Sequence, residues 1–314
     1  MQPTGRWQLG LSLASLTALM WGLLPVALKA LLDKMDPYTI TWYRFLVAAT
    51  ILGGFLARKR RFPALSRLGW RGRSLLIIAI LGLVGNYLLY LVGLNWVTPA
   101  TSQMVIQLAP MFLLLGGLVF FHESFQRGQW AGFVVLIAGL VLFFNDRFAD
   151  LASGGSTYYA GVVITIVAAV SWAAYALIQK QLLRVYDSEQ ILVLIYAAAV
   201  VLILPLISVR QLLLLNRVQL GLLLFCCLNT LVAYGAFAEA LVHWDASRVS
   251  AVLALAPLFT LLAIWAVSRW FPDYAVPEHL DFLSVIGAFL VVAGSMAAAL
   301  ARRRVRTPVP RPME

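Results

Sequence analysis

Long apolar runs separated by short polar stretches dominate the pattern of this chain. A helix needs about 20 predominantly apolar residues to cross a bilayer, and ten runs in the sequence approach or exceed that length. The predicted spans are residues 9–32, 38–57, 74–96, 100–121, 128–145, 156–183, 188–208, 219–243, 246–270 and 281–301. Lipid offers no hydrogen-bond partner to an exposed backbone amide, so the spans are expected to be helices. The pattern predicts an all-α integral membrane protein with ten transmembrane helices.

Composition supports a lipid environment. Of the 314 residues 62% are apolar and 12% are charged, whereas a soluble domain carries roughly 25% charged residues. The net charge of +11 would suggest a nucleic-acid partner in a soluble protein. Here the Lys and Arg residues lie between and after the apolar runs, where membrane topology explains them. We therefore expect membrane lipid, and no nucleic acid, as a partner.

The basic loops also predict an orientation. The loop between the second and third spans and the C-terminal tail carry half of the 24 Lys and Arg residues, at Arg58, Lys59, Arg60, Arg61, Arg67, Arg71, Arg73, Arg302, Arg303, Arg304, Arg306 and Arg311. Both segments follow even-numbered spans, and positive charge is retained on the cytoplasmic side. Both termini, including a basic tail at 304–314, are expected in the cytoplasm.

The chain contains an internal repeat. Trp21 and Lys29 recur as Trp172 and Lys180 with the same eight-residue separation. Each copy holds five spans, an odd number, so the two copies must insert with opposite orientations. The prediction is two inverted five-helix repeats, at residues 1–148 and 149–303. This architecture occurs in transporters that bind substrate near the membrane midplane between the halves.

Further matches extend the repeat. Leu108-Ala109-Pro110 corresponds to Leu255-Ala256-Pro257, and with the same offset Tyr87 corresponds to Tyr234. Glycines match in the fifth and tenth spans, at Gly132, Gly139, Gly287 and Gly294. The motifs resemble those of the drug/metabolite transporter superfamily, specifically its EamA-type ten-helix members, over residues 9 to 301. The resemblance implies export of small metabolites, with amino acids as the expected class, across the inner membrane of a bacterium by alternating access.

Aromatic and polar side chains at matched depths are the candidate substrate ligands. We select Trp21, Tyr87, Tyr90, Gln107, Trp172, Tyr175 and Tyr234. Rigid amphipathic rings can wall a pocket for a small zwitterion, and Gln can supply donors and acceptors. The same residues could instead pack between helices, and Gln103 and Gln107 could bridge them.

Two charged residues are candidates for a charge or coupling ligand. Arg44 lies about two turns inside the second span and could hold a substrate carboxylate or a set of helix-end carbonyls. Ionisable residues within a span suggest function. Glu239 lies about one turn from a span end, so it is either a proton or substrate ligand or an interfacial group near His243.

Enzyme signatures are lacking. The sequence has no Gly-rich phosphate loop and no His-Glu-x-x-His, and it has only three His. No metal or cofactor is expected, and the chain is predicted not to be an enzyme. A membrane enzyme acting on a lipid-linked substrate, a scaffold without transport, and a carrier of other metabolites or drugs remain alternatives. A small-molecule substrate is the expected partner, for a monomer or a weak homodimer.

Overall fold

The computed structural model describes residues 4–64, 68–121, 126–147, 157–274 and 280–301. Across these ranges the regular secondary structure is helical, and turns and short loops connect the helices. Within these residues, nine membrane spans are long and apolar enough to cross a bilayer, and a tenth, shorter apolar helix joins them. The predicted all-α ten-helix membrane fold with two repeats is confirmed. The predicted tail at 304–314 lies outside the described residues.

The first repeat contains α1 (Trp7–Leu32), α2 (Pro37–Arg58), α3 (Trp70–Trp96), α4 (Pro99–Val105), α5 (Leu108–Phe121) and α6 (Arg127–Phe143), followed by the 3-10 turn η2 (Asn145–Arg147). The second contains α8 (Thr157–Leu182), α9 (Ser188–Ile203), η3 (Leu204–Leu206), η4 (Val209–Leu214), α10 (Arg217–His243), α11 (Ala246–Leu253), α12 (Ala256–Trp270), η5 (Pro272–Tyr274) and α13 (Phe282–Leu300).

The fourth and ninth spans differ from prediction, because each is broken into two helices. The breaks fall at Ile106-Gln107, between α4 and α5, and at Ala254-Leu255, between α11 and α12. Pro110 and Pro257 lie in the first turns of α5 and α12, respectively. Proline lacks the amide N–H that would continue the helical ladder and clashes with the carbonyl four residues earlier. The repeated Leu-Ala-Pro therefore places a break at the same depth in both repeats.

An Asp follows each copy of the repeated Trp and Lys, and each starts a helix. The Asp36 carboxylate accepts hydrogen bonds from the backbone amides of Tyr38 and Thr39, both at 2.8 Å, at the start of α2. Asp187 is the N-cap of α9 and forms a capping box with Gln190. These contacts satisfy amides that the first helical turn leaves unpaired. The repeat therefore includes the signal that begins the second helix of each half.

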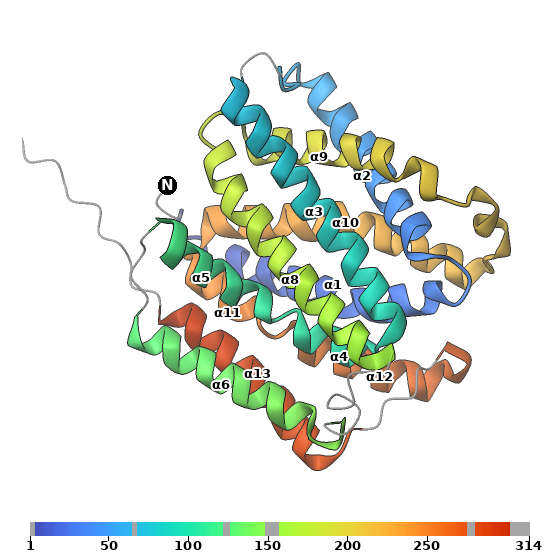
Figure 1. The fold of residues 1–314 in the computed structure, drawn as a ribbon, viewed down its shortest axis with the longest axis vertical. Helices are drawn as coiled ribbons and strands as arrows, with labels where there is room; N and C mark the ends of the chain where they lie inside the picture. Colours follow the sequence, from blue (N-terminus) through green and yellow to red (C-terminus); the bar gives the residue numbers. More distant parts are fainter. Residues whose placement is uncertain (1–3, 65–67, 122–125, 148–156, 275–279, 302–314) are drawn as a thin grey trace, which may run out of the picture.

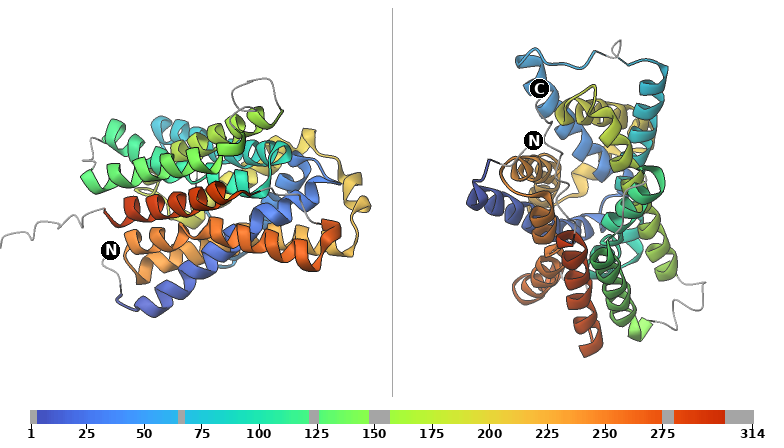
Figure 2. Two further views of the ribbon diagram at one scale, coloured as in Figure 1. Left: turned by 90° about the horizontal axis from the view of Figure 1, so that it is seen from below. Right: turned by 90° about the vertical axis from the view of Figure 1, so that its left-hand side faces the viewer.

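The repeats interlock. The most extensive helix contacts join α6 to α13, α3 to α8, α1 to α10 and α2 to α9, and each pair takes one helix from each repeat. Figures 1 and 2 show α13 (red) beside α6 (green) in different views. The predicted repeat limits at 148 and 149 fall within residues that the structure does not describe. Contact between the repeats, and not within one, builds most of the described core.

The four matched glycines bring α6 and α13 into backbone contact. A Cβ added to Gly132 would lie 2.7 Å from the Gly294 carbonyl oxygen, and one added to Gly139 would lie 2.8 Å from the Gly287 carbonyl oxygen. Small residues allow membrane helices to approach closely and gain dispersion energy without a hydrophobic driving force. The glycine match found in the sequence is thus an interface between the last helices of the two repeats.

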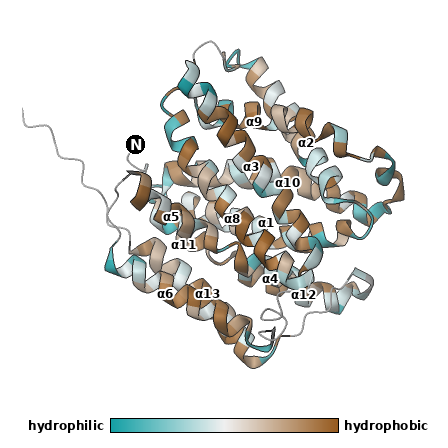
Figure 3. Ribbon diagram, viewed as in Figure 1, coloured by the Kyte–Doolittle hydropathy of each residue, from teal (hydrophilic) through white to brown (hydrophobic). Residues whose placement is uncertain are grey.

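The outer surface is apolar where helices would face lipid. Large side chains such as Leu81, Val134 and Phe289 are exposed. Figure 3 shows brown, hydrophobic colour along the helices and teal, hydrophilic colour concentrated at helix ends and loops. In a soluble protein such surface would aggregate, whereas a bilayer accommodates it.

Candidate functional site

A cavity of about 340 Å³ lies between the repeats. Such a volume falls within the range of about 300–1,000 Å³ that is usual for small-molecule sites. Both repeats contribute to its wall, which is mainly apolar with a few amide, hydroxyl and phenol groups. The polar and aromatic lining residues are Trp21, Arg44, Asn86, Tyr87, Tyr90, Gln103, Gln107, Gln129, Trp172, Asn229, Tyr234, Phe237, Ser247, Ser250 and Ser295.

The structure brings six of the seven selected substrate ligands to this cavity: Trp21, Tyr87, Tyr90, Gln107, Trp172 and Tyr234. Tyr175 is not a lining residue. It is 3% exposed and belongs to the core, and its Cβ lies 3.1 Å from the position of a Cβ added to Gly82. Tyr175 follows Trp172 by three residues, which is less than the roughly 3.6 residues of a full turn, so its side chain leaves the helix in a different direction. It packs against α3 at Gly82. A binding role for these residues stays a prediction.

Of the two charged candidates, the cavity contains one. Arg44 lines it. Glu239 is exposed and lies outside the lining, with its Oε1 atom 3.1 Å from His243 Nε2. His243 is buried, and its Nδ1 atom lies 2.7 Å from Thr4 Oγ1. Glu239 therefore belongs to a polar group at the end of α10.

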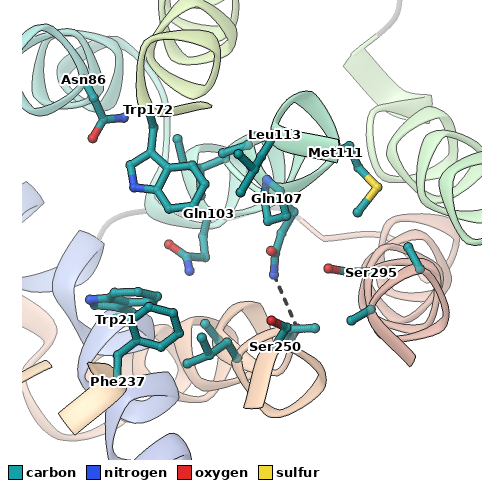
Figure 4. Close-up of a pocket in the computed structure, with 18 of the residues that line it drawn as sticks. Trp21, Asn86, Gln103, Gln107, Met111, Leu113, Trp172, Phe237, Ser250 and Ser295 are labelled. Carbon is teal, nitrogen blue, oxygen red and sulfur yellow. Dashed lines mark hydrogen bonds between the residues drawn. The ribbon is translucent and has the colours of Figure 1, made fainter. Parts of the chain in front are cut away.

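The repeated tryptophans lie on different walls of the cavity. Figure 4 shows the Trp172 ring above Gln103 and the Trp21 ring below it, with Gln107 beside them. The Trp21 ring lies 5.4 Å from that of Tyr234 in an edge-on arrangement and 5.9 Å from that of Phe237. These contacts orient the Trp21 ring, which together with its neighbours forms an aromatic surface at the cavity.

The two helix breaks meet at the cavity. Gln107 Nε2 donates a hydrogen bond to the carbonyl oxygen of Ala254 at 3.3 Å, shown as the dashed line in Figure 4. A broken helix exposes backbone polar groups that lipid cannot satisfy, and such backbone is tolerated only when it is buried in protein or lines a polar cavity. Gln107 lines the cavity and satisfies one of these carbonyls.

Lys29 is not a cavity cation. Its Nζ atom donates to the carbonyl oxygens of Leu94, Asn95 and Val97, at 2.8, 3.0 and 2.8 Å. A cation is favourable at a helix C-terminus, where carbonyls lack intrahelical partners. Lys29 thus fixes the end of α3 against the end of α1.

The cavity reaches one membrane face. Its lining includes Gln129, Ala246, Ser247, Ala298 and Ala299, all within the first or last turn of α6, α11 or α13. Hydrogen bonds from Thr4 to the end of α10 place the start of the chain on this same face. No described lining residue comes from the last turns of α1 or α3, on the opposite face.

Asymmetry between the repeats explains why one face is closed. α4 packs against α12 towards the closed face, whereas their counterparts α11 and α5 make no comparable contact among the described residues. Likewise α13 packs against α11 and α12, whereas its counterpart α6 does not contact α4 or α5 to a similar extent. The two repeats therefore have the same helices in different arrangements.

Several lining residues were not selected from sequence. Phe237 matches Tyr90 in the repeat, so the repeat itself could have identified it. Gln129, Ser247, Ser250 and Ser295 lie in the open half of the cavity. Ser250 matches Gln103 in the repeat, which is a signal in the sequence. For the other three residues the only signal is their polarity within or beside apolar runs, because their exposure to the cavity results from the asymmetric arrangement of the repeats. Within the described ranges, no three His, Cys, Asp or Glu side chains are grouped as metal ligands.

Ten apolar helices in two interlocked repeats, with broken helices at a central cavity, define a membrane transporter fold. The sequence profile of the EamA-like transporter family matches residues 8–145 and 159–300. The chain belongs to this family, within the drug/metabolite transporter superfamily.

Relatives agree with this assignment. The chain is 40% identical over 299 residues to an uncharacterized transporter of Haemophilus influenzae, covering 94% of this chain and 96% of the relative. It is 40% identical over 297 residues to the uncharacterized inner membrane transporter YhbE of Escherichia coli, covering 94% and 92%. A probable amino-acid metabolite efflux pump of Salmonella typhimurium is 25% identical over 295 residues, covering 90% and 92%.

A solved structure has the same fold. It superposes with a TM-score of 0.63 at 19% identity, covering 94% of this chain and 99% of the other.

Proposed function

We propose that the chain is a secondary carrier that exports small metabolites, amino acids foremost, across the cytoplasmic membrane of a bacterium by alternating access. The observation that carries the proposal is the central cavity between the repeats, whose described lining includes helix ends from one membrane face and none from the last turns of α1 or α3 on the other. A channel would connect both faces. A carrier exposes its site to one face at a time.

Inverted symmetry supports the alternation. If the two repeats exchanged arrangements, α11 would pack against α5 as α4 now packs against α12. The cavity would then be closed at the membrane face where the chain begins and open at the opposite membrane face. The basic loops favour the cytoplasm for the face that is now open, so this arrangement would accept substrate from inside the cell. Both termini are proposed to lie in the cytoplasm.

Amino acids are favoured by the size and chemistry of the cavity. Its volume of about 340 Å³ suits a molecule of that size, its aromatic walls suit apolar side chains, and its amides suit a polar head. The relatives named probable amino-acid metabolite efflux pumps point the same way. The chain is proposed to bind a small-molecule substrate and lipid, to act without a cofactor, and to be a monomer or a weak homodimer.

Counterflow into liposomes tests the proposal. Purified protein is reconstituted into vesicles loaded with one unlabelled amino acid, and the entry of the same labelled amino acid is followed. The panel includes aliphatic, aromatic and thioether amino acids. Saturable entry that requires the unlabelled partner inside, and is absent from protein-free vesicles, supports a carrier. Absence of counterflow for the whole panel would contradict amino acids as the substrate class.

An enzyme acting on a lipid-linked substrate is the competing function. It would require a polar catalytic cluster near one membrane face. The group formed by Glu239, His243 and Thr4 is located there, but it is outside the central cavity. Replacement of His243 by Asn therefore separates the two functions, since counterflow should survive it and catalysis at that cluster should not.

A further inference from the structure

Arg44 lies at the deep end of the cavity, away from the open face, and its guanidinium group has hydrogen-bond donors without acceptors in the described part of the chain. It is the eighth residue of α2, which places it roughly 10 Å along the helix from Pro37 at about 1.5 Å per residue. The side chain is buried, with 3% of its surface exposed, and it lines the cavity.

The hydrogen-bond and cation–π partners of Arg44 in the structure engage only part of its guanidinium group. Its Nε atom donates to Thr230 Oγ1 at 3.2 Å, and its Cζ atom lies 4.6 Å from the centre of the Tyr87 ring. The Thr230 hydroxyl donates in turn to the carbonyl oxygen of Cys226 at 3.2 Å, which leaves its oxygen free to accept from Arg44. These contacts hold the guanidinium in place.

The two terminal nitrogens of Arg44 have no acceptor among the described residues. No described lining residue is an Asp or a Glu. A charge at membrane depth without a counter-ion is costly, and residues of this kind commonly mark a substrate or ion pathway. The ring of Tyr87 offsets part of that cost, but it provides no hydrogen-bond acceptor for the terminal N–H groups.

We propose that Arg44 binds the carboxylate of the transported substrate. This inference rests on the proposed function, because it names the group of the substrate that the cavity recognises. A guanidinium presents two parallel N–H donors to the two oxygens of a carboxylate, and such paired contacts are both strong and directional. A phosphate ester, with more charge, would need several cations, and Arg44 is the single one in the described lining.

The other end of the substrate meets neutral groups. The Asn86 and Asn229 side-chain amides donate to the carbonyl oxygens of Ala168 and Met20, at 2.8 and 2.7 Å. Gln103 Oε1 accepts from the Tyr90 hydroxyl at 3.5 Å. The described lining therefore offers amides, but no carboxylate, to an ammonium group. The substrate carboxylate should be essential for binding, and its ammonium group should contribute less.

Matched ligands on the wild-type protein provide the test. The thermal-unfolding midpoint is titrated with phenylalanine, 3-phenylpropionate, phenethylamine and phenylalanine amide, and with the corresponding set built on leucine. The two compounds in each set that carry a carboxylate should raise the midpoint, and the two without one should bind roughly 10- to 100-fold more weakly. Equal binding of the amine or the amide, or no carboxylate-dependent shift in either set, overturns the inference.

Substitutions of Arg44 test whether this residue causes the preference for carboxylates. Arg44→Gln should abolish the preference for carboxylates, and Arg44→Lys should retain it in weakened form because an ammonium keeps the charge without the paired donors. Arg217→Gln, at an exposed position in the first turn of α10, is the control and should keep the preference. A structural role for Arg44 alone would lower the midpoint of Arg44→Gln equally with every ligand and leave the preference intact.

Counterflow distinguishes this inference from the proposed function. If Arg44→Gln transports amino acids like the wild type, the result contradicts carboxylate binding by Arg44 and still supports the carrier function. The wild type could instead transport no amino acid but retain the carboxylate-dependent shift in midpoint. That result would contradict amino acids as the substrate class and support the carboxylate site at Arg44.

Discussion

Gln107 Nε2 and the carbonyl oxygen of Ala254 are 3.3 Å apart, and these two residues occupy the same position in the two repeats. The Leu-Ala-Pro motifs that follow them fix this correspondence. If the repeats exchange arrangements, these two positions exchange places and remain neighbours, although Ala254 has no side-chain donor with which to form the equivalent hydrogen bond. The two breaks should therefore stay together while the helices around them move.

The first prediction concerns this contact. Gln107→Ala should lower the counterflow rate by roughly 2- to 10-fold, as expected for one hydrogen bond worth about 0.5–1.5 kcal/mol. The thermal-unfolding midpoint should change little, because the break remains packed. A variant that transports normally would show that the contact is dispensable, and one that fails to fold would show that it is structural.

The second prediction concerns the asymmetric helix contacts. Leu261 of α12 packs on the core that contains Ala100 of α4, and their counterparts are Leu114 of α5 and Ser247 of α11. In a background without Cys226 and Cys227, the pair Ala100→Cys and Leu261→Cys should cross-link in the arrangement seen here. The pair Leu114→Cys and Ser247→Cys should cross-link only in the exchanged arrangement.

A transported substrate should change the yields of these two cross-links in opposite directions. A third pair, Gln107→Cys and Ala254→Cys, serves as the control and should respond little. If both helix pairs cross-link together in one molecule, the repeats do not alternate.

The third prediction concerns the glycine contacts between α6 and α13. Gly132→Ala and Gly139→Ala should each destabilise the protein by about 1–3 kcal/mol, the usual cost of overpacking, because the added methyl group meets backbone atoms of α13. Gly54→Ala is the matched control, since nothing lies within 4 Å of a Cβ added there. Equal unfolding midpoints for Gly54→Ala and Gly139→Ala would contradict the close contact.

The fourth prediction concerns pH. Asp281 lies outside the membrane spans at the start of α13, where the side chain and backbone amide of Ser284, together with Asn145, lower the pKa of its carboxyl group. A lowered folded-state pKa means that the carboxylate stabilises the fold above its unfolded pKa of about 3.9. The contribution is lost as pH falls through the folded-state pKa.

Thermal unfolding of wild type and Asp281→Ala across pH measures this effect. The wild type should have the higher midpoint at neutral pH, and the difference should narrow below about pH 4. Asp146→Ala, in the neighbouring η2 turn, is the control. A difference that does not vary with pH would exclude the carboxylate as its source.

The sequence predicted the fold well because each signal was local or repeated. Apolar run length predicted the spans, and the recurrence of Trp21 as Trp172 predicted two copies. The odd number of spans per copy then required inversion. The helix breaks were harder to predict, because a proline can also remain inside a continuous helix, as Pro25 does in α1.

The site was predicted only in part. Repeat matching selected Trp21, Tyr87, Trp172 and Tyr234, which face the cavity because equivalent positions face the same interface. It could not find Ser247 or Ser295, which the cavity includes because one half is open. Glu239 also shows that being ionisable within an apolar run does not decide which face of the helix a residue occupies.

The most direct test of a carrier with its site between the repeats is counterflow by the double variant Trp21→Ala, Trp172→Ala. The control is Trp265→Ala, on the outer surface of α12 with 61% of its surface exposed. Both variants should show a single thermal-unfolding transition, which checks that a loss of counterflow is not caused by misfolding. We expect saturable counterflow in the wild type and the control, and its loss in the double variant. Unchanged counterflow in the double variant would contradict the central site.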